Sequence, residues 1–339
     1  MNSPGNDGCT LTGALAVAAE VRDAVTIIHG PAGCAHHNVS LLHAVNLSRG
    51  RMGMPRILSS DLTEEDVIFG GEPVLEETIR SAARGRPGVV VVLSTCVAGT
   101  IGDDVAALCR EDYGVPVVHV PAAGFMDGGF HDGTLQALIA LGGMAQKTGT
   151  DGSVNLIGEK SLEFEVEEHY RELRRLLDLL GVQVNLRFVH DIRTADIGRL
   201  GRASLNILRE PALAPAGDAF RARFDTPCLD TFPIGMSGTL IFLEKVGDLL
   251  DRDSSAAITY ETRYQHEVLD RFEGLRGQKV RLDTASCPPG NDACTRELLE
   301  ILDLDTGPGG CPVPLPDPFP VGTTGILRLL HRWRRCVHA

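Results

Sequence analysis

Three cysteines are the residues of this sequence whose type and surroundings could do the most chemistry. Cys9, Cys34 and Cys96 each lie where a glycine-containing turn or the end of an apolar run is expected. Cys34 closes the segment His-Gly-Pro-Ala-Gly-Cys directly after the apolar run 25–28, and Cys96 follows the run 89–93. Thiolates delivered from such turns can converge on one point, and a soft, carboxylate-free set of cysteines suits an iron–sulfur cluster. The alternative is that each is a small core residue, because free cysteine is among the most buried residue types.

The bulk composition limits the classes of protein to which the chain can belong. At 339 residues it exceeds the size at which one hydrophobic core usually stops growing, so two or three subdomains are expected. No apolar run could cross a bilayer and the first residues lack a signal-peptide pattern, which predicts a cytoplasmic protein with no membrane partner. Reducing conditions there favour metal ligands or buried thiols over disulfides for the nine cysteines. A net charge of −13 argues against a nucleic-acid partner.

Short β-rich apolar runs alternate with helix-like stretches along the chain. The expected strands are Val25–Ile28, Val89–Leu93, Val115–Val120, Val154–Ile157, Val182–Val189 and Lys279–Leu282. The expected helices are Glu72–Ala83, Asp103–Glu111, Gly133–Met144 and Lys160–Leu180. Strands that alternate with helices indicate βαβ units and a parallel sheet, in which ligands gather at the carboxyl ends of the strands. Cys34 and Cys96 both follow a strand, so both are expected at that edge.

Changes in composition divide the chain into three parts. The polar stretch 146–151 and the stretch of charged and small residues 247–255 are interpreted as boundaries. The resulting domains are 1–150 (a cluster-binding α/β domain), 151–248 (a second α/β domain) and 249–339 (a shortened, partly irregular third domain). In the third domain, proline and glycine crowd the stretch 306–318, which is therefore not expected to hold a regular sheet. The predicted fold class is α/β, with two to three Rossmann-like subdomains of parallel βαβ units, the last one reduced.

Three segments, in this order along the chain, resemble the signature segments of one family. The segments His29 to Cys34, Ser60 to Glu72 and Ser94 to Asp104 look like those of component 1 of nitrogenase and its relatives. These relatives are dinitrogenase subunits, their cofactor-assembly scaffolds, and nitrogenase-like reductases that act on tetrapyrroles or methylthio-alkanes. The resemblance covers nearly all of residues 8–245 and returns faintly at 321–325.

The resemblance implies a role for the three cysteines. In that family each subunit carries three cysteines that hold a cluster at the interface with a partner subunit, and Cys9, Cys34 and Cys96 fall on the matching motifs. They are therefore the implied cofactor-binding and metal-binding residues. The implied iron–sulfur cluster is an eight-iron P-cluster (8Fe-7S) or a four-iron cluster (4Fe-4S) shared with the partner. The implied partners are an α-like homologous subunit, in an α2β2 heterotetramer, and an ATP-dependent iron-protein reductase.

Departures from the family pattern indicate which subunit the chain resembles. The stretch 124–131 lacks the serine that some P-cluster subunits supply, and 203–210 lacks the cysteine with which α-type subunits anchor their active-site cofactor. By contrast, 231–240 resembles the Pro-Ile-Gly segment of β-type subunits. The resemblance thus implies a β-like (K-type) oxidoreductase subunit with no catalytic residue of its own, which relays electrons to a metallocofactor on the partner. Methylthio-alkanes are a plausible substrate class.

Two other functions fit the same segments. One is a cofactor-assembly scaffold, which holds a precursor cluster and hands it on without turnover. The other is a homodimeric tetrapyrrole reductase component, in which one cluster lies between two copies of the chain. Reductase-dependent turnover of a heteromer would favour the enzyme subunit, and release of the cluster to an apo-enzyme would favour the scaffold.

Several other side chains could do chemistry but have weaker patterns. His36 and His37 could tune a cluster through hydrogen bonds, although a solvent-facing helix position is the simpler interpretation. Asp103 and Asp104 are expected to start a helix, where negative charge is favoured, and to have a structural role. The remaining cysteines are interpreted as core residues or as lacking the paired spacing of a structural zinc site: Cys109, Cys228, Cys287, Cys294, Cys311 and Cys336.

Overall fold

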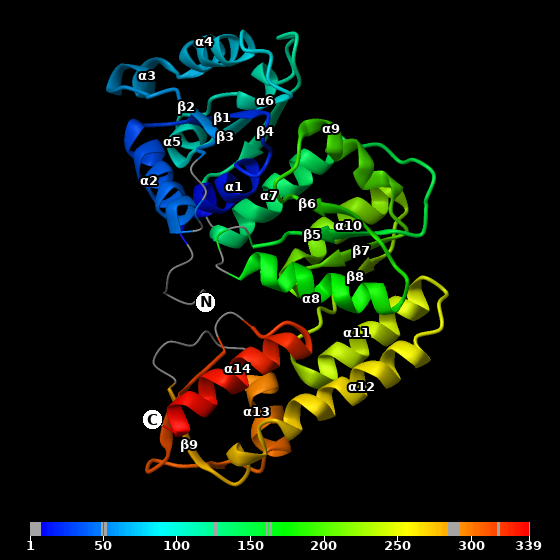
Figure 1. The fold of residues 1–339 in the computed structure, drawn as a ribbon. Helices are drawn as coiled ribbons and strands as arrows, with labels where there is room; N and C mark the ends of the chain where they lie inside the picture. The colour runs from blue at the N-terminus through cyan, green and yellow to red at the C-terminus, as the bar shows by residue number, and fades with distance from the viewer. Residues whose placement is uncertain are drawn as a thin grey trace. The chain divides into compact units, whose positions relative to one another are not determined.

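The computed structural model describes residues 8–48, 50, 53–124, 128–160, 162, 165–283, 292–316 and 319–338. It divides into an N-terminal unit (Asn2–Phe164 with Val184–Cys228) and a C-terminal unit (Glu165–Gln183 with Leu229–Ala339). The N-terminal unit contains two four-stranded sheets and the C-terminal unit a three-stranded one (Figure 1). Every strand pair whose register the structure gives is parallel, which confirms the predicted α/β class.

The first sheet has the strand order β2-β1-β3-β4. Its strands are β1 (Ala24–His29), β2 (Arg56–Ser59), β3 (Val89–Ser94) and β4 (Val117–Pro121). Alternate side chains of β1 enter two separate cores. Val25 packs with α4 (Glu72–Ala83) and α6 (Val105–Leu108), whereas Ile28 packs with α1 (Thr10–Ala18) and α7 (Phe130–Gly142). The chain passes from β1 to β2 on one side and then to β3 on the other, so the strand order reverses between β1 and β3. Parallel sheets bind ligands at this kind of switch point.

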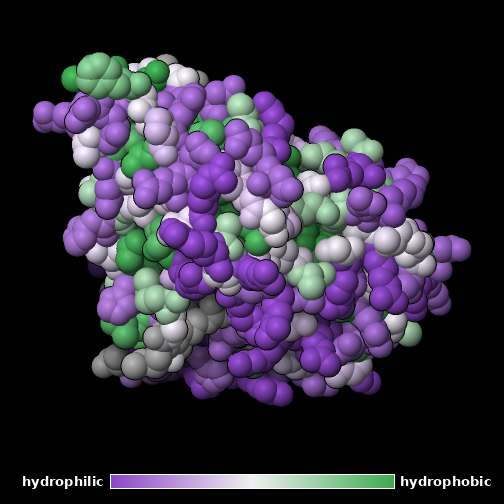
Figure 2. Space-filling model, turned by 90° about the horizontal axis from the view of Figure 1, so that it is seen from above, coloured by the Kyte–Doolittle hydropathy of each residue, from purple (hydrophilic) through white to green (hydrophobic). Residues whose placement is uncertain are grey.

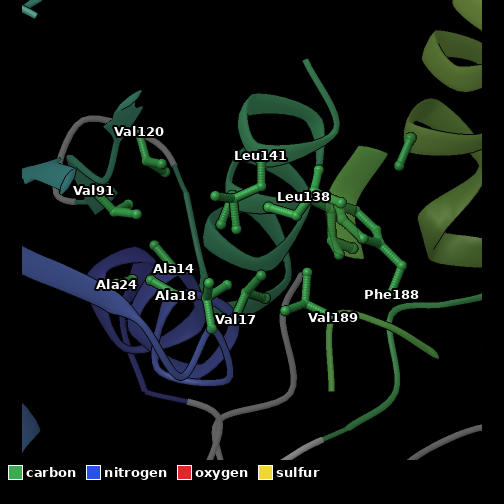
Figure 3. Close-up of a cluster of buried hydrophobic side chains, with 14 of the residues drawn as sticks. Ala14, Val17, Ala18, Ala24, Val91, Val120, Leu138, Leu141, Phe188 and Val189 are labelled. Carbon is green, nitrogen blue, oxygen red and sulfur yellow. The ribbon is translucent and has the colours of Figure 1, made fainter. Parts of the chain in front are cut away.

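Helices α1 (Thr10–Ala18) and α7 (Phe130–Gly142) cross at two glycines. A Cβ on Gly13 would lie 1.9 Å from a carbonyl oxygen of α7, and a Cβ on Gly133 would lie 1.8 Å from a carbonyl oxygen of α1. Ala14 of α1 and Leu141 of α7 belong to the same buried apolar cluster (Figure 3). The crossing therefore fixes α1 against the core, and with it Cys9 at the start of this helix.

The second sheet of the N-terminal unit has the strand order β6-β5-β7-β8. Its strands are β5 (Val154–Ile157), β6 (Val184–Phe188), β7 (Leu205–Leu208) and β8 (Cys228–Leu229). The other elements of this unit are α2 (Ala32–Ser48), α3 (Glu64–Phe69), α5 (Cys96–Ile101), α9 (Thr194–Ile197), η2 (Gly198–Arg202), η3 (Pro211–Leu213) and α10 (Ala214–Phe224). Phe188 of β6 meets Phe220 of α10 edge to face within the core that also contains α1 and α7.

The C-terminal unit contains a small parallel sheet of order β10-β9-β11. Its elements are α8 (Val166–Leu179), α11 (Gly235–Leu249), α12 (Ser255–Asp270), η4 (Glu273–Leu275), β9 (Lys279–Asp283), α13 (Asp292–Ile301), β10 (Asp305–Thr306), β11 (Cys311–Pro314) and α14 (Gly322–Val337). Trp333 is buried in its core and donates its indole N–H to Pro314 O at 2.9 Å. The expectation that proline excludes a sheet here is wrong. β11 carries Pro312 and Pro314, but it is an edge strand, where proline is tolerated.

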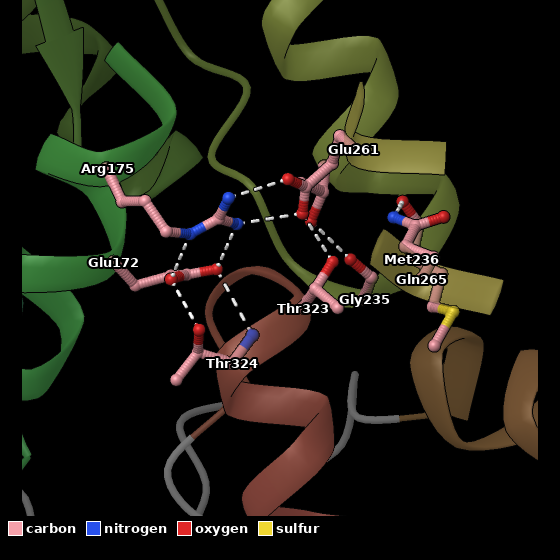
Figure 4. A network of polar contacts seen from close by, with 9 residues as sticks. Glu172, Arg175, Gly235, Met236, Glu261, Gln265, Thr323 and Thr324 are labelled. Atoms are coloured by element: carbon pink, nitrogen blue, oxygen red, sulfur yellow. Dashed lines mark hydrogen bonds and ion pairs between the residues drawn. The ribbon is translucent and has the colours of Figure 1, made fainter. Parts of the chain in front are cut away.

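A buried ion network ties three helices of the C-terminal unit together (Figure 4). Arg175 of α8 donates to Glu172 of the same helix and to Glu261 of α12, with N···O distances of 2.8–2.9 Å. At the start of α14, the hydroxyls of Thr323 and Thr324 donate to Glu261 and Glu172 at 2.5 and 2.6 Å. Burial acts to raise the pKa of Glu172, but the hydrogen bonds from Arg175 and Thr324 hold it below its ordinary value.

The surface drawn in Figure 2 is mostly hydrophilic, and its apolar side chains form separate patches. Among the described residues, the most exposed large apolar side chains are Phe69 (81%) and Ile68 (74%), at the end of α3. No helix in the described part of the chain is long and apolar enough to cross a membrane.

Candidate metal centre

The three cysteines singled out above each lie at the N-terminus of a helix in the N-terminal unit. Cys9 is the N-cap of α1, Cys34 is the third residue of α2, and Cys96 is the first residue of α5. None of these helices has an acidic residue in its first turn. Because a helix N-terminus carries a partial positive charge, it stabilises a thiolate placed there. The sequence thus delivers three sulfurs, each to a position that favours negative charge.

The structure also brings the three thiols together. Burial raises the pKa of the Cys34 thiol, and the neighbouring sulfurs of Cys9 and Cys96 raise it further. Cys9 is exposed and the other two are half-buried, so the group faces the molecular surface. Cys34 and Cys96 follow β1 and β3 and so lie at the carboxyl edge of the first sheet, as the sequence predicted, and the strand order makes this place the switch point. Their mutual repulsion as thiolates would be relieved by a metal group, which deprotonates the thiols that it binds.

The surroundings of the thiols fit a group larger than one ion. The buried hydroxyls of Thr10 and Thr95, next to Cys9 and Cys96, have no hydrogen-bond partner among the described residues. Beside Cys34, a Cβ on the exposed Gly33 would meet nothing within 4 Å. Within the described ranges, no three His, Cys, Asp or Glu side chains are arranged to hold a single metal ion. Soft donors, open space and unsatisfied hydroxyls together suit an iron–sulfur cluster completed by further ligands.

A buried histidine that the sequence analysis did not single out ends β1, just before the turn that leads to Cys34. His29, the last residue of β1, contacts Ser60 Oγ through Nδ1 and Asp103 Oδ2 through Nε2, both at 3.0 Å. Ser60 Oγ also accepts from Gly30 N, and Asp103 Oδ1 accepts from Gly71 N. This network joins the turn before Cys34 to the turn after α5.

The partners of His29 define its protonation. An ionised carboxylate only accepts hydrogen bonds, so Nε2 carries the proton given to Asp103 and Nδ1 accepts from the Ser60 hydroxyl. Burial lowers the pKa of His29 from its ordinary 6.5, although the bond to Asp103 opposes this. Asp103 is thus a buried partner of histidine, and only Asp104 starts a helix: it caps α6 by accepting from Ala107 N at 2.9 Å.

Lowering the pH from about 7.5 to 5.5 is expected to reduce the free energy of unfolding. The unfolded chain takes up the proton as the pH falls through 6.5, whereas folded His29, with its lowered pKa, takes it up only at a lower pH. The unfolded state then binds more protons, which costs at most about 1.4 kcal/mol per pH unit for one histidine. His119, whose pKa burial also lowers, acts in the same direction. In urea unfolding, His29→Asn is expected to give a shallower pH slope, and an unchanged slope would contradict this protonation state.

The other candidate residues lie apart from this site or give it no further ligand. His36 and His37 are exposed on α2. Burial raises the pKa values of Cys109 and Cys294 to about 12, which is typical of core thiols. Cys228 packs against the core and donates to Gly217 O at 3.1 Å. Cys287 and the stretch 125–127 lie outside the described residues.

The carboxyl end of β7, within the segment 203–210, presents charged groups and no thiol. Glu210 accepts from His131 Nδ1 and Lys160 Nζ, both at 3.1 Å. Burial acts to raise the pKa of Glu210, but His131 and Lys160 lower it to about 2. Glu210 is therefore an ionised member of a neutralised cluster.

Comparison with known proteins identifies relatives of the chain. Residues 9–282 match the family described as nitrogenase component 1 type oxidoreductase. The chain is 28% identical over 288 residues to the nitrogenase iron-molybdenum cofactor biosynthesis protein NifE of Clostridium pasteurianum, covering 81% of this chain and 62% of that protein. It is 27% identical over 324 residues to the nitrogenase molybdenum-iron protein alpha chain of Methanococcus maripaludis, covering 88% and 66%.

A solved structure, nitrogenase Cp1 at pH 5, has the same fold with a TM-score of 0.66 at 22% identity, covering 90% of this chain and 65% of that one. The chain spans about six tenths of the length of the NifE proteins of Clostridium pasteurianum and Rippkaea orientalis. The family match covers most of the chain and begins at Cys9, the first of the three cysteines. The chain therefore belongs to the nitrogenase component 1 type oxidoreductase family.

Proposed function

We propose that this chain is a subunit of a nitrogenase-like reductase and holds an iron–sulfur cluster through the thiolates of Cys9, Cys34 and Cys96. The observation that carries the proposal is the arrangement of the sulfurs: each lies at a helix N-terminus, and Cys34 is electrostatically coupled to the other two. When bound, an eight-iron P-cluster or a four-iron cluster would supply a one-electron relay. The residues of this chain fix its place and stabilise the negative sulfurs.

The remaining ligands are proposed to come from a partner chain. Three thiols that face the surface leave one side of a cluster open, and a homologous subunit can approach that side. We infer an α-like partner in an α2β2 assembly, with the cluster between the two chains. The β-like role rests on this chain's residues. The segment 203–210 has no cysteine, and its last residue, Glu210, follows β7 and pairs with His131 and Lys160. An alpha chain is among the relatives, so the likeness alone does not select this role.

The substrate would then be reduced on the partner's metallocofactor. No nucleophile or proton donor of this chain is needed for that step, because its proposed task is electron transfer. Methylthio-alkanes are our proposed substrate class, and they remain a prediction from the family resemblance.

An exposed apolar surface on α3 supports docking of an electron-donating reductase near the proposed cluster. Val67, Ile68 and Phe69 are 41%, 74% and 81% exposed, and α3 packs against α5, the helix that begins with Cys96. Apolar side chains exposed to this degree at the end of one helix are typical of a protein interaction site. A protein that binds here would lie close to Cys96.

Replacing Phe69 by alanine is expected to weaken the reductase complex about tenfold or more, because exposed aromatic anchors dominate interface energies. Titration of reductase-dependent electron transfer against reductase concentration measures the effect. Ile241→Ala is the matched control, because Ile241 is an exposed apolar residue (44%) of the C-terminal unit. Equal effects of the two substitutions would contradict docking at α3.

Anaerobic purification from the source cells tests the proposal as a whole. Mass spectrometry of co-purifying chains, with counts of iron, molybdenum and vanadium, is expected to find a larger homologous chain and more iron than one shared cluster explains. A chain that purifies alone as a dimer, with iron for about one four-iron cluster, would contradict the β-like role. That result would favour the homodimeric tetrapyrrole reductase.

A cofactor-assembly scaffold is the second candidate function. The observation that favours it is the likeness to proteins named for iron-molybdenum cofactor biosynthesis, at 28% and 31% identity. A scaffold would use the same three thiolates but release what they hold. Mixing the iron-loaded protein with an apo-enzyme distinguishes the two functions, because only a scaffold transfers its cluster and activates that enzyme.

A further inference from the structure

Two buried polar side chains connect the helix of Cys9 to the helix of Cys34. Thr12 lies one turn after Cys9 in α1, and Asn38 lies one turn after Cys34 in α2; they are 5% and 3% exposed. Thr12 Oγ1 is 3.6 Å from Cys9 Sγ and donates to Asn38 Oδ1 at 2.7 Å. Asn38 Nδ2 donates to the carbonyl oxygen of Cys34 at 2.8 Å. Thr12 and Asn38 therefore connect Cys9 to Cys34 through three consecutive polar contacts.

The protons in this set of contacts determine what the Thr12 hydroxyl can do. The carbonyl oxygen of Cys34 only accepts, so Asn38 directs its amide nitrogen there and its Oδ1 to Thr12. While Cys9 is a thiol, its S–H can donate to Thr12 Oγ1. Once Cys9 is a thiolate, the S–H proton is gone, and the single proton of the Thr12 hydroxyl can go either to the sulfur or to Asn38 Oδ1.

The space around Thr12 confines its hydroxyl to these two acceptors. Gly8 has a φ of +63°, and a Cβ there would lie 2.9 Å from both Cβ and Oγ1 of Thr12. The residue before Cys9 is thus packed closely on Thr12. Because the side chain has little room to turn away, its O–H stays near Cys9 Sγ.

We propose that Thr12 and Asn38 are positioning residues for the cluster: when the Cys9 sulfur holds iron, the Thr12 hydroxyl turns its single proton from Asn38 Oδ1 to that sulfur, and Asn38, held at the Cys34 turn, is the acceptor that competes for this proton. The inference rests on the proposed function, because it requires a cluster at Cys9 and Cys34. Hydrogen bonds to the sulfurs of a cluster stabilise its reduced, more negative state and so raise its reduction potential.

Thr12→Val tests the hydroxyl, because valine has the shape of threonine without its donor. In the anaerobically loaded protein, we expect iron release to a chelator to be about tenfold faster, at the lower end of what ligand-supporting groups contribute. A tenfold weaker stabilisation of the reduced cluster lowers its midpoint potential by about 59 mV, measured by redox titration followed by electron paramagnetic resonance. Thr12→Ser keeps the donor and is expected to retain the wild-type potential.

Asn38→Leu provides a second, independent variant that keeps the size of the side chain. It removes the acceptor that competes for the Thr12 proton, so it is expected to raise the potential. In the double variant with Thr12→Val no hydroxyl is left to redirect, so this rise is expected to be absent. Additive effects would overturn the coupling. If Thr12→Val does not fold, Asn38→Leu carries the same test.

The outcomes separate this inference from the proposed function. A wild-type protein that binds no cluster overturns both. A wild-type protein that binds one, with equal potentials and release rates in Thr12→Val and Thr12→Ser, overturns the inference alone.

Discussion

Replacing Cys34 by alanine is expected to lower the iron bound by the purified protein at least about tenfold and to weaken association with the partner chain. The Cys34 sulfur lies close enough to those of Cys9 and Cys96 for both to raise its pKa, so its replacement removes a ligand next to the other two. Groups that only support a ligand already contribute about 10–100-fold to metal affinity, and loss of a ligand costs more. Iron content by mass spectrometry and assembly size by anaerobic gel filtration measure the two effects.

Cys109→Ala is the matched control for this experiment. Cys109 is 9% exposed, lies in the core shared by the first sheet with α4 and α6, and has a pKa raised to about 12 by burial. Its replacement is expected to leave the iron content unchanged. Full iron retention in Cys34→Ala, or equal iron loss in both variants, would contradict the ligand assignment.

Replacing Arg175 by leucine is expected to destabilise the C-terminal unit by about 3 kcal/mol, at the lower end of the cost of breaking a buried ion pair. The arginine side chain is 30% exposed, but the carboxylates of Glu172 and Glu261 are 2% and 0% exposed and would lose their cation. Urea unfolding measures the loss. Arg174→Leu is the matched control: this arginine is 66% exposed and lies 3.9 Å from Asp178, so its loss is expected to cost little.

The pH dependence of the same variant provides an independent check. In the wild type, the pKa of Glu172 is lowered from 4.5, so this carboxylate stabilises the fold above that pH and loses its contribution as the pH falls. Without Arg175, the Glu172 carboxylate is a buried, unpaired charge, and its protonation removes that charge. The difference in free energy of unfolding between the variant and the wild type is therefore expected to shrink in acid. If this difference in unfolding free energy stays constant from about pH 7 to 4, the unpaired carboxylate charges are not the cause of the lost stability.

The elements that the sequence predicted best are those with unbroken apolar runs. β5 has the predicted bounds, and β3 extends the predicted run by one residue, because buried parallel strands read as continuous valine and leucine. The edge strand β2 was missed, since it has only four residues, two of them apolar, and is only partly buried. The expected helix 103–111 is reduced to α6 (Val105–Leu108), because Asp103 contacts His29 instead.

The sequence predicts the cysteines of the candidate site but not the side chains that contact one another around them. The cysteines are recognisable from the glycine-containing turns around them, and their place at the carboxyl edge follows from the apolar runs before Cys34 and Cys96, whereas the switch point needs the strand order of the folded sheet. His29 pairs with a residue 74 positions away, and Thr12 pairs with one 26 positions away, so only the folded chain brings these partners together. The division into domains 1–150, 151–248 and 249–339 stays a prediction.

The most direct test of the central claim is an anaerobic crystal structure of the purified complex, with an anomalous difference map recorded at the iron edge. The account predicts iron in contact with the sulfurs of Cys9, Cys34 and Cys96, with further ligands from the partner chain. Iron bound elsewhere, or three sulfurs without iron in a complex that retains reductase-dependent activity, would contradict it.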